Sequence, residues 1–241
     1  MNNFGLKFNA VDCEQGTPEW FEARAGVITG SMISTIRARL KNGDWSAAAK
    51  KYAFRLAFER VAKSVLDDTY SNAYMKRGNA LENDARLFHE MEYGVLIIVP
   101  GFYVSECGRF GASPDGLIGA DGGAEYKCFL SPDELMPILI DGDVSTVMDQ
   151  VQMNMLATGR QLWDFFLYTP QIAGVCEKPY KIYRIERDEN YIAAMMADLT
   201  EFDGLINYYA DLIAGQYGIN AAKEILDAPA EEEQATFDFE V

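Results

Sequence analysis

The chain has 241 residues, of which 49% are hydrophobic and 24% charged, a composition typical of a folded globular protein and not of a disordered chain. No apolar run approaches the roughly 18 residues of a membrane span, and the N-terminus lacks the layout of a secretion signal, so we expect a protein that stays in the cytoplasm. The net charge of −16 opposes phosphate binding, although a local basic track and bound divalent ions can outweigh a global charge.

Three helices are predicted in the N-terminal third. Thr17-Pro18-Glu19 is a helix start with Thr17 as N-cap, and Thr29-Gly30-Ser31 is a second capping cluster that predicts a helix over 32–40. Ser46 caps a third helix with a basic face, which is a candidate DNA track or simply a solvated surface. The residues of this basic face are Lys50, Lys51, Arg55, Arg60 and Lys63.

The remaining elements alternate between strands and helices. A helix is predicted over 73–93, with Leu81, Ala85, Phe88 and Met91 as its apolar stripe. Further helices are predicted from Ser131, over 144–158 and over 189–214, and strands over 95–99, 102–104, 123–128, 162–168 and 180–185. The pattern predicts one α/β domain over 1–228, a central mixed sheet between helical layers, with an acidic tail over 229–241.

The choice of reaction chemistry is narrowed by two residue types. His89 is the only histidine, and the four cysteines form no Cys-x-x-Cys pair, which disfavours histidine or cysteine zinc sites and a Ser-His-Asp triad. We take His89 as structural or exposed. Hydrolytic chemistry in this chain would therefore depend on carboxylates and a hard cation such as Mg²⁺.

One group of ionisable residues suits that chemistry. Asp115 stands in a turn after a strand, and Glu125 and Lys127 share one face of the next strand because they are two positions apart. The two carboxylates and the Tyr126 carbonyl can hold a divalent ion, and the Lys127 amine can hold or deprotonate the water that attacks a phosphorus. The alternative is a cross-strand salt pair on a solvated sheet face.

Several sequence blocks resemble a known family in order and spacing. They are Glu19-Trp20 to Ser31, Glu82-Asn83-Asp84-Ala85-Arg86, Ser113-Pro114-Asp115-Gly116-Leu117, Glu125-Tyr126-Lys127-Cys128, Gln150-Val151-Gln152 and Ile185-Glu186-Arg187-Asp188-Glu189. Over about residues 13–215 the chain resembles the phage lambda exonuclease family, the YqaJ-type viral recombinases, within the PD-(D/E)xK nuclease superfamily. The resemblance implies a restriction-endonuclease-like core.

The resemblance also implies an activity. Members of such a family digest one strand of linear double-stranded DNA from the 5′ end with Mg²⁺, as a homotrimeric ring, and leave 3′ overhangs for recombination by a phage single-strand annealing protein. We therefore expect two Mg²⁺ ions, with Mn²⁺ as a substitute, and action in the cytoplasm of a bacterial host.

The family's site residues carry over by position. Asp115 and Glu125, with the Tyr126 carbonyl, are the expected metal ligands, and Glu82 is expected at a second ion. Lys127 would activate the water and Gln152 would position it. The expected pocket for a 5′ phosphate consists of Arg24, Ser31 and Ser113.

The chain departs from the family pattern at two places. Tyr126 stands where relatives usually have an aliphatic residue, and Phe129 where a proline often follows the cysteine. Only the carbonyl of Tyr126 is needed as a ligand, whereas Phe129 predicts a different exit from the strand.

Other interpretations remain open at this stage. Glu82 and Arg86 are four apart on a helix and form a surface ion pair in the simpler interpretation, and Gln152 and Arg24 are then ordinary polar residues. Two other functions compete: a restriction-like or repair endonuclease of the same superfamily, and a non-catalytic acidic protein that mimics DNA. A 5′-phosphate pocket argues against the first, and grouped carboxylates argue against the second.

Overall fold

The computed structural model describes residues 5–66 and 73–218, with side chains for all of these except 73–80. The predicted acidic tail over 229–241 lies outside the described residues. Within them, no helix has both the length and the apolarity that a bilayer crossing requires.

Three of the α-helices begin at the predicted residues Thr17, Ser46 and Ser131. The Thr17 side chain accepts a hydrogen bond from Trp20 N, and Ser46 accepts one from Ala49 N. The α-helices are α1 (Pro18–Ala23), α2 (Ile33–Arg37), α3 (Ala47–Ala62), α4 (Ala73–Tyr93), α5 (Pro132–Met136), α6 (Ser145–Thr158) and α7 (Glu189–Gln216). Short turns of other helical type are η1 (Gly30–Met32), η2 (Pro137–Asp141) and η3 (Pro170–Ile172).

The helix predicted over 32–40 is the main error among the helices. The chain forms the 3₁₀ turn η1 and then the five-residue helix α2, and no side chain caps either element. Ile33 and Ile36 are completely buried, so tertiary packing holds this segment in place of a capping hydrogen bond.

The α/β fold class is confirmed, with the strands divided between two mixed sheets flanked by helices. One sheet has the order β1-β4-β5-β2 and the other β3-β6-β7-β8-β9. Their bounds are β1 (Phe8–Val11), β2 (Ile28–Thr29), β3 (Ile97–Ile98), β4 (Phe102–Ser105), β5 (Phe110–Ala112), β6 (Gly116–Ile118), β7 (Gly122–Lys127), β8 (Leu162–Tyr168) and β9 (Tyr180–Glu186). Pro114, which has no backbone N–H, separates β5 from β6, so the chain changes sheet there.

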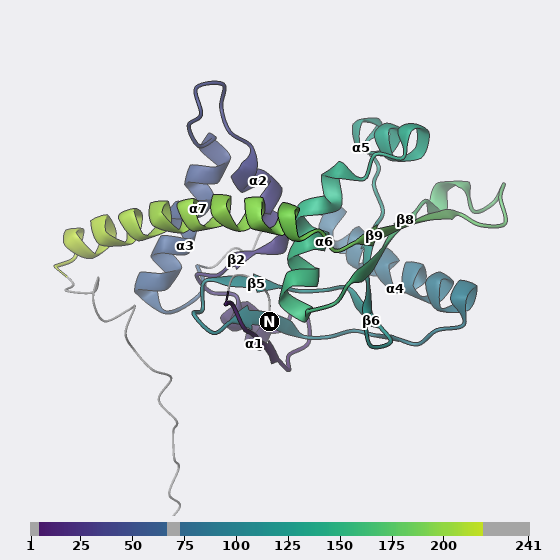
Figure 1. Ribbon diagram of the computed structural model, residues 1–241, viewed down its shortest axis with the longest axis horizontal. Coiled ribbons are helices and arrows are strands. Elements are labelled where there is room, and N and C mark those ends of the chain that lie inside the picture. The colour runs from purple at the N-terminus through teal and green to yellow at the C-terminus, as the bar shows by residue number, and fades with distance from the viewer. Residues whose placement is uncertain (1–4, 67–72, 219–241) are drawn as a thin grey trace, which may run out of the picture.

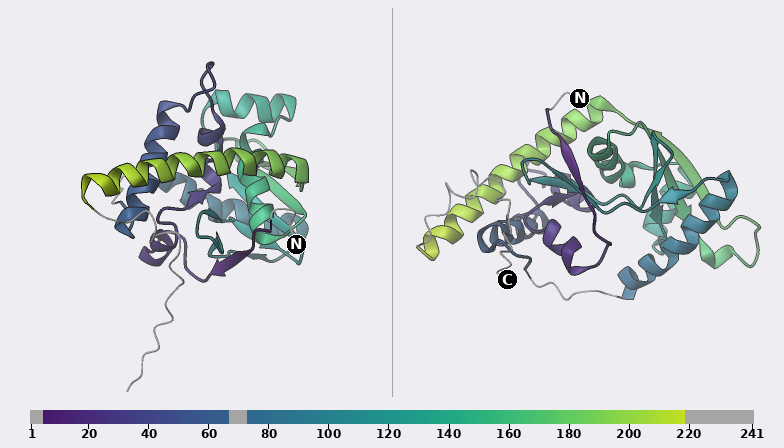
Figure 2. Two further views of the ribbon diagram at one scale, coloured as in Figure 1. Left: turned by 60° about the vertical axis from the view of Figure 1, so that its left-hand side comes forward. Right: turned by 90° about the horizontal axis from the view of Figure 1, so that it is seen from below.

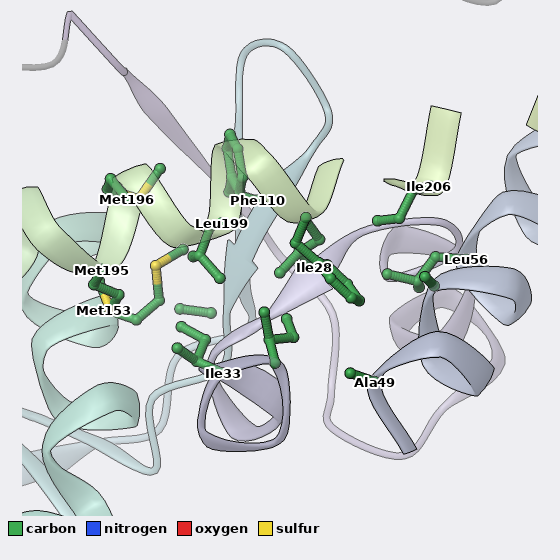
Figure 3. Close-up of a cluster of buried hydrophobic side chains, with 14 of the residues drawn as sticks. Ile28, Ile33, Ala49, Leu56, Phe110, Met153, Met195, Met196, Leu199 and Ile206 are labelled. Atoms are coloured by element: carbon green, nitrogen blue, oxygen red, sulfur yellow. The ribbon is translucent and has the colours of Figure 1, made fainter. Parts of the chain in front are cut away.

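The larger apolar core joins the N-terminal elements to α7. Figures 1 and 2 show the long helix α7 with α3 beside it, on the side of the molecule away from α4. Figure 3 shows part of this core, in which β2, α2, α3, α6 and α7 meet. Its labelled residues are Ile28, Ile33, Ala49, Leu56, Phe110, Met153, Met195, Met196, Leu199 and Ile206.

The five-stranded sheet lies between α6 on one face and α4 on the other. In β8, Phe165 and Leu167 pack with α6, whereas Phe166 packs with α4, as the alternation of strand side chains requires. Because β7 pairs with β8 in register, Glu125 lies beside Phe165 and Tyr126 beside Phe166. The Glu125 side chain therefore points to the α6 face and the Tyr126 side chain to the α4 face.

Candidate active site

A cavity of about 490 Å³ lies where the two sheets, α1 and α4 meet. Most of the predicted site residues line its wall, and Glu125 lies directly beneath the wall. The exception is Gln152. The predicted residues at the wall are Arg24, Ser31, Glu82, Ser113, Asp115, Tyr126 and Lys127.

The turn after β5 delivers Asp115 to the carboxylate side of the cavity. The β6–β7 hairpin brings Tyr126 next to this turn, and Tyr126 N donates a hydrogen bond of 2.9 Å to Asp115 Oδ2. Asp115 is only 7% exposed. The backbone of the Glu-x-Lys strand therefore holds the aspartate in place, while its second oxygen makes no hydrogen bond to a backbone group in the described residues.

Glu125 is completely buried and has two side-chain partners. Lys127 Nζ lies 2.6 Å from its Oε1, and Asn154 Nδ2 donates to its Oε2 at 3.1 Å. Lys127 and Glu125 share one face of β7, as the spacing predicts, while Asn154 reaches the same carboxylate from α6. The predicted grouping of Asp115, Glu125 and Lys127 is thus present, and it faces a cavity and not a solvated sheet surface.

Burial raises the pKa values of all three carboxyl groups, and repulsion by Asp115 adds to the rise at Glu125 and Glu82. Burial, then the nearby Asp115 carboxylate, raises the pKa of Glu125 to about 8 and that of Glu82 to about 7. Burial also raises the pKa of Asp115, whose carboxyl is close enough to Glu125 to share a proton. Burial opposes the charge on Lys127, but Glu125 and Asp115 outweigh it and raise the Lys127 pKa. The cluster therefore retains a proton at neutral pH unless another cation replaces it.

This set of groups fits a divalent cation of the hard type. Among the described residues, no three His, Cys, Asp or Glu side chains form a complete metal cage. Mg²⁺ does not require one, because it is commonly bound by one or two carboxylates together with waters and substrate phosphates. Asp115 and Glu125, with the Tyr126 carbonyl, are the groups that would hold it, and Glu82 stands at the cavity wall for a second ion.

The opposite side of the cavity is cationic. The Arg24 guanidinium stacks on the Trp20 ring at 3.9 Å from its centroid, and Trp20 Nε1 donates to Ser113 Oγ at 2.8 Å. Within the described part of the chain, Arg24 has no hydrogen bond or ion pair to a carboxylate. Burial lowers its pKa to about 10, so it stays charged at neutral pH. A planar guanidinium of this kind suits a phosphate, to which it can donate two parallel hydrogen bonds.

Ser31 lies on the same side of the cavity, in η1. We expected it in the first turn of a helix, where the dipole favours an anion. It lies instead in a single 3₁₀ turn before a five-residue helix, which provides little dipole. Its contribution to a phosphate pocket would come from its hydroxyl and from nearby backbone N–H groups.

The loop between Arg24 and Ser31 is held from behind by α3. Gly26 N donates to the buried Glu59 Oε2 at 2.8 Å, and Arg60 Nε donates to Gly26 O at 2.8 Å. Gly26 has φ of +69°, and a Cβ there would lie 2.6 Å from Arg60 Cγ. The loop that carries Arg24 is therefore fixed in one conformation.

Gln152 does not reach the cavity, so its predicted position is wrong. Its Nε2 donates to Glu186 O at 2.8 Å, and its Oε1 accepts from Asp188 N at 3.0 Å. The side chain is completely buried and joins α6 to the turn between β9 and α7. The Gln152 amide thus pairs with backbone groups at the start of α7 and the end of β9, which explains why a polar side chain occupies a buried position.

Two residues of α6 that we did not single out lie at the cavity instead. Gln150 and Asn154 are four apart, so they share a helix face that Gln152 does not. If Gln150 is taken as the site residue of this helix, the four-residue spacing of a helix face indicates Asn154 as the next one. The family pattern indicated Gln152 because it does not show which face of α6 meets the cavity.

The surface ion pair considered between Glu82 and Arg86 is not observed. Arg86 Nη2 donates to Asn83 Oδ1 at 2.5 Å, whereas Glu82 faces the cavity.

The basic face of α3 is used in part for contacts within the fold. Arg60 forms an ion pair with Asp203 at 2.7 Å, and Arg55 forms one with Glu59 at 2.9 Å. Part of that face is thus structural, and a DNA track along the rest stays a prediction.

Comparison with known proteins is consistent with this site. The model of the YqaJ-like viral recombinase domain matches residues 19–161. LHK-Exo, an alkaline exonuclease from Laribacter hongkongensis, is 28% identical with a TM-score of 0.71, covering 84% of this chain and 98% of that chain; it was also crystallised in complex with dAMP.

A phage related exonuclease from Haemophilus somnus 129PT is more distant. It is 15% identical with a TM-score of 0.56, covering 79% of this chain and 96% of that chain, which shows a shared fold. No curated protein gives a significant match. Because the domain model spans more than half of the sequence, the chain belongs to the YqaJ-like viral recombinase family.

Proposed function

We propose that this protein is a Mg²⁺-dependent exonuclease that digests one strand of linear double-stranded DNA from its 5′ end and leaves a 3′ overhang. One observation carries the proposal: a single cavity has a carboxylate and lysine cluster on one side and an arginine stacked on Trp20 on the other. A terminal phosphate bound at Arg24 would place the adjoining phosphodiester beside Asp115 and Lys127. The nuclease assignment is supported by the family match and by the alkaline exonuclease neighbours.

The carboxylate side would carry out the hydrolysis. Mg²⁺, or Mn²⁺ in its place, supplies charge for the attacking and the leaving oxygen of the phosphodiester when two ions are bound. Asp115 and Glu125 would hold the ions, and the Asn154 amide fixes the Glu125 carboxylate by a hydrogen bond. Lys127 Nζ, at 2.6 Å from Glu125, would hold the attacking water, and it would accept the water's proton once bound metal neutralises the carboxylates that keep the amine charged.

The arginine side would select the end of the strand. A planar guanidinium offers a phosphate two parallel hydrogen bonds, and stacking on Trp20 keeps the Arg24 plane fixed. Ser113 accepts from Trp20 Nε1 and so has its hydroxyl proton available for an anion. An endonuclease has no need for such a pocket, because an internal phosphate carries a nucleotide on both sides.

A DNA mimic is disfavoured by burial. Mimicry requires rows of exposed carboxylates, whereas Asp115 is 7% exposed and Glu125 completely buried. Binding of double-stranded DNA by a chain with a charge of −16 would depend on local cations such as Arg24 and on the bound metal.

We further propose a homotrimeric ring and a phage single-strand annealing protein as partner, both implied by the family resemblance. Two unlike apolar patches support a head-to-tail contact, since unlike surfaces that join copies by rotation close into rings. One patch is a groove between α3 and α7 formed by Phe54, Phe58, Leu212, Ile213 and Tyr217. The other is on α4 and β3, with Leu87, Met91, Leu96 and Ile98 exposed. Action in the cytoplasm of a bacterial host belongs to the same proposal.

Digestion of a linear duplex labelled separately at each end would test the proposed function. We expect shortening from 5′ ends only with Mg²⁺ or Mn²⁺, faster on 5′-phosphorylated than on 5′-hydroxyl ends. A covalently closed circular duplex serves as control, because an endonuclease would open it. Cleavage of the circle, or equal digestion in excess EDTA, would refute the proposal.

A further inference from the structure

The one histidine of the chain is buried directly behind the Glu-x-Lys strand. His89 is 0% exposed, and its Nδ1 lies 3.1 Å from the hydroxyl of Tyr126. On its other side, Nε2 lies 3.3 Å from Asp164 Oδ2, although the direction of the N–H misses hydrogen-bond geometry. Arg184 in turn donates two hydrogen bonds to Asp164, of 2.8 and 2.9 Å. The proposed hydrolysis uses none of these side chains.

The charges around the ring decide where its proton lies. Burial by itself would raise the pKa of Asp164, but His89 and Arg184 outweigh it and lower that pKa, so Asp164 is ionised. A carboxylate only accepts, so a tautomer with the imidazole proton on Nε2 suits Asp164 and leaves Nδ1 as the acceptor for the Tyr126 hydroxyl. Whichever of the two groups donates, the contact of 3.1 Å between Nδ1 and the hydroxyl joins α4 to β7 in a set direction.

The position of Glu82 depends on how α4 sits on the sheet. Glu82 and His89 are seven residues apart on α4, which is two helical turns, so they share one face of the helix. Glu125 lies on the opposite face of the sheet, the α6 side, so Glu82 reaches the carboxylate cluster only if α4 is correctly placed along β7. A shift of the helix would separate the two metal-binding groups.

Apolar packing of α4 on the sheet comes from a few side chains. Ala85 is completely buried, and Leu81 and Phe88 pack partly buried beside it, whereas Leu87 is 56% and Met91 79% exposed. Of the α4 side chains that the structure describes, His89 is the fully buried polar one. Directional hydrogen bonds set position more sharply than contacts of a small apolar side chain.

We propose that His89 and the Tyr126 hydroxyl are a positioning pair that sets the affinity of the Glu82 side of the cavity for its metal ion. The pair acts through the placement of α4 and touches neither substrate nor metal. This inference rests on the proposed function, since it takes Glu82 as a ligand of a second ion. It also gives a role to the tyrosine that stands at the centre of the Glu-x-Lys triplet.

Binding of Mn²⁺ to the full-length protein without DNA tests the pair independently of turnover. Electron paramagnetic resonance of free Mn²⁺ during a titration measures the number of sites and their dissociation constants. We expect Tyr126→Phe, which removes only the hydroxyl, to weaken the Glu82-dependent site about tenfold or more, as loss of a supporting contact behind a ligand typically does. Glu82→Gln should remove the second site altogether.

Variants at His89 and a matched tyrosine sharpen the test. His89→Asn keeps an acceptor near the position of Nδ1 and should retain more of the second site than His89→Leu. Tyr183→Phe is the matched control, because its hydroxyl donates to Ile138 O at 2.8 Å in the same sheet without contacting α4. The control should lower thermal stability without changing either dissociation constant.

The possible outcomes distinguish a failure of the positioning pair from a failure of the two-ion site. If Tyr126→Phe and His89→Leu lower only the melting temperature, as the control does, the positioning pair is refuted and the proposed function stands. If the wild-type protein has no Glu82-dependent site, the two-ion arrangement is refuted, and the positioning pair with it.

Discussion

The two sides of the cavity differ in the sign of their buried charges and in how those charges are balanced. On the carboxylate side, Lys127 Nζ lies 2.6 Å from Glu125, and burial raises the pKa of Glu125 to about 8, so a bound cation would compete with a proton for this cluster. On the other side, Arg24 lies on an aromatic ring, has no ion pair with a carboxylate within residues 5–66 and 81–218, and stays charged. One side is prepared for a cation and the other for an anion, and a metal-bound phosphodiester with a terminal phosphate would satisfy both.

The largest effect is expected from loss of the lysine on the carboxylate side. Lys127→Ala should lower the rate of single-turnover digestion about 1,000-fold or more, because it removes the group that holds and deprotonates the water. Asp115→Ala should be as severe. Lys178→Ala is a control, since Lys178 pairs with Glu92 on the surface. Full activity of either cavity variant, with the fold verified by circular dichroism, would contradict the catalytic assignment.

A smaller effect, on end preference, is expected from the arginine side. A charged hydrogen bond of this kind contributes about 1.5–3 kcal/mol, so Arg24→Ala should reduce the preference for 5′-phosphate over 5′-hydroxyl ends roughly 10-fold to 100-fold. The measurement is the ratio of rates on the two ends. Arg39→Ala is a matched control, because Arg39 also stacks on a tryptophan, Trp45, but lies away from the cavity. An unchanged ratio in the Arg24 variant would remove Arg24 from the pocket.

The raised pKa of Glu125 predicts a pH effect on the metal-free protein. A carboxyl group whose pKa rises on folding, here from 4.5 to about 8, stabilises the fold below the lower value and loses that contribution as pH rises toward the higher one. When the pH is raised from 6 to 8.5 in the presence of EDTA, the melting temperature should therefore decrease by roughly a few degrees. Mg²⁺ should restore it, and Glu125→Gln should remove both effects. A pH-independent difference between wild type and variant would contradict this explanation.

The smallest effect on catalysis is expected at Gln152. Gln152→Leu removes two buried hydrogen bonds and should lower stability by about 1–3 kcal/mol, measured by urea unfolding. Digestion by the folded variant should change by less than about threefold, because the side chain lies outside the cavity. Asn154→Leu should show the reverse, with a larger loss of activity, because its amide holds Glu125. If Gln152→Leu and Asn154→Leu lose equal amounts of activity, Gln152 takes part in the active site after all.

Local signals in the sequence were sufficient for much of the fold and for the centre of the site. Capping at Thr17 and Ser46 and the strand of 162–168 match the structure, because hydrogen bonds to a nearby backbone and alternating side chains act over a few residues. The proximity of Asp115, Glu125 and Lys127 follows from a turn and a hairpin, which are also local.

What tertiary structure alone decided lies farther apart along the chain. The division of the strands into two sheets, the face of α6 that presents Asn154 and not Gln152, and the burial of His89 behind Tyr126 all depend on how helices dock on sheets. Docking sums many weak contacts between segments that are distant in sequence, so spacing within any one segment cannot reveal which face is turned inward. By itself the sequence determined which groups are available for chemistry, and packing determined which of them meet.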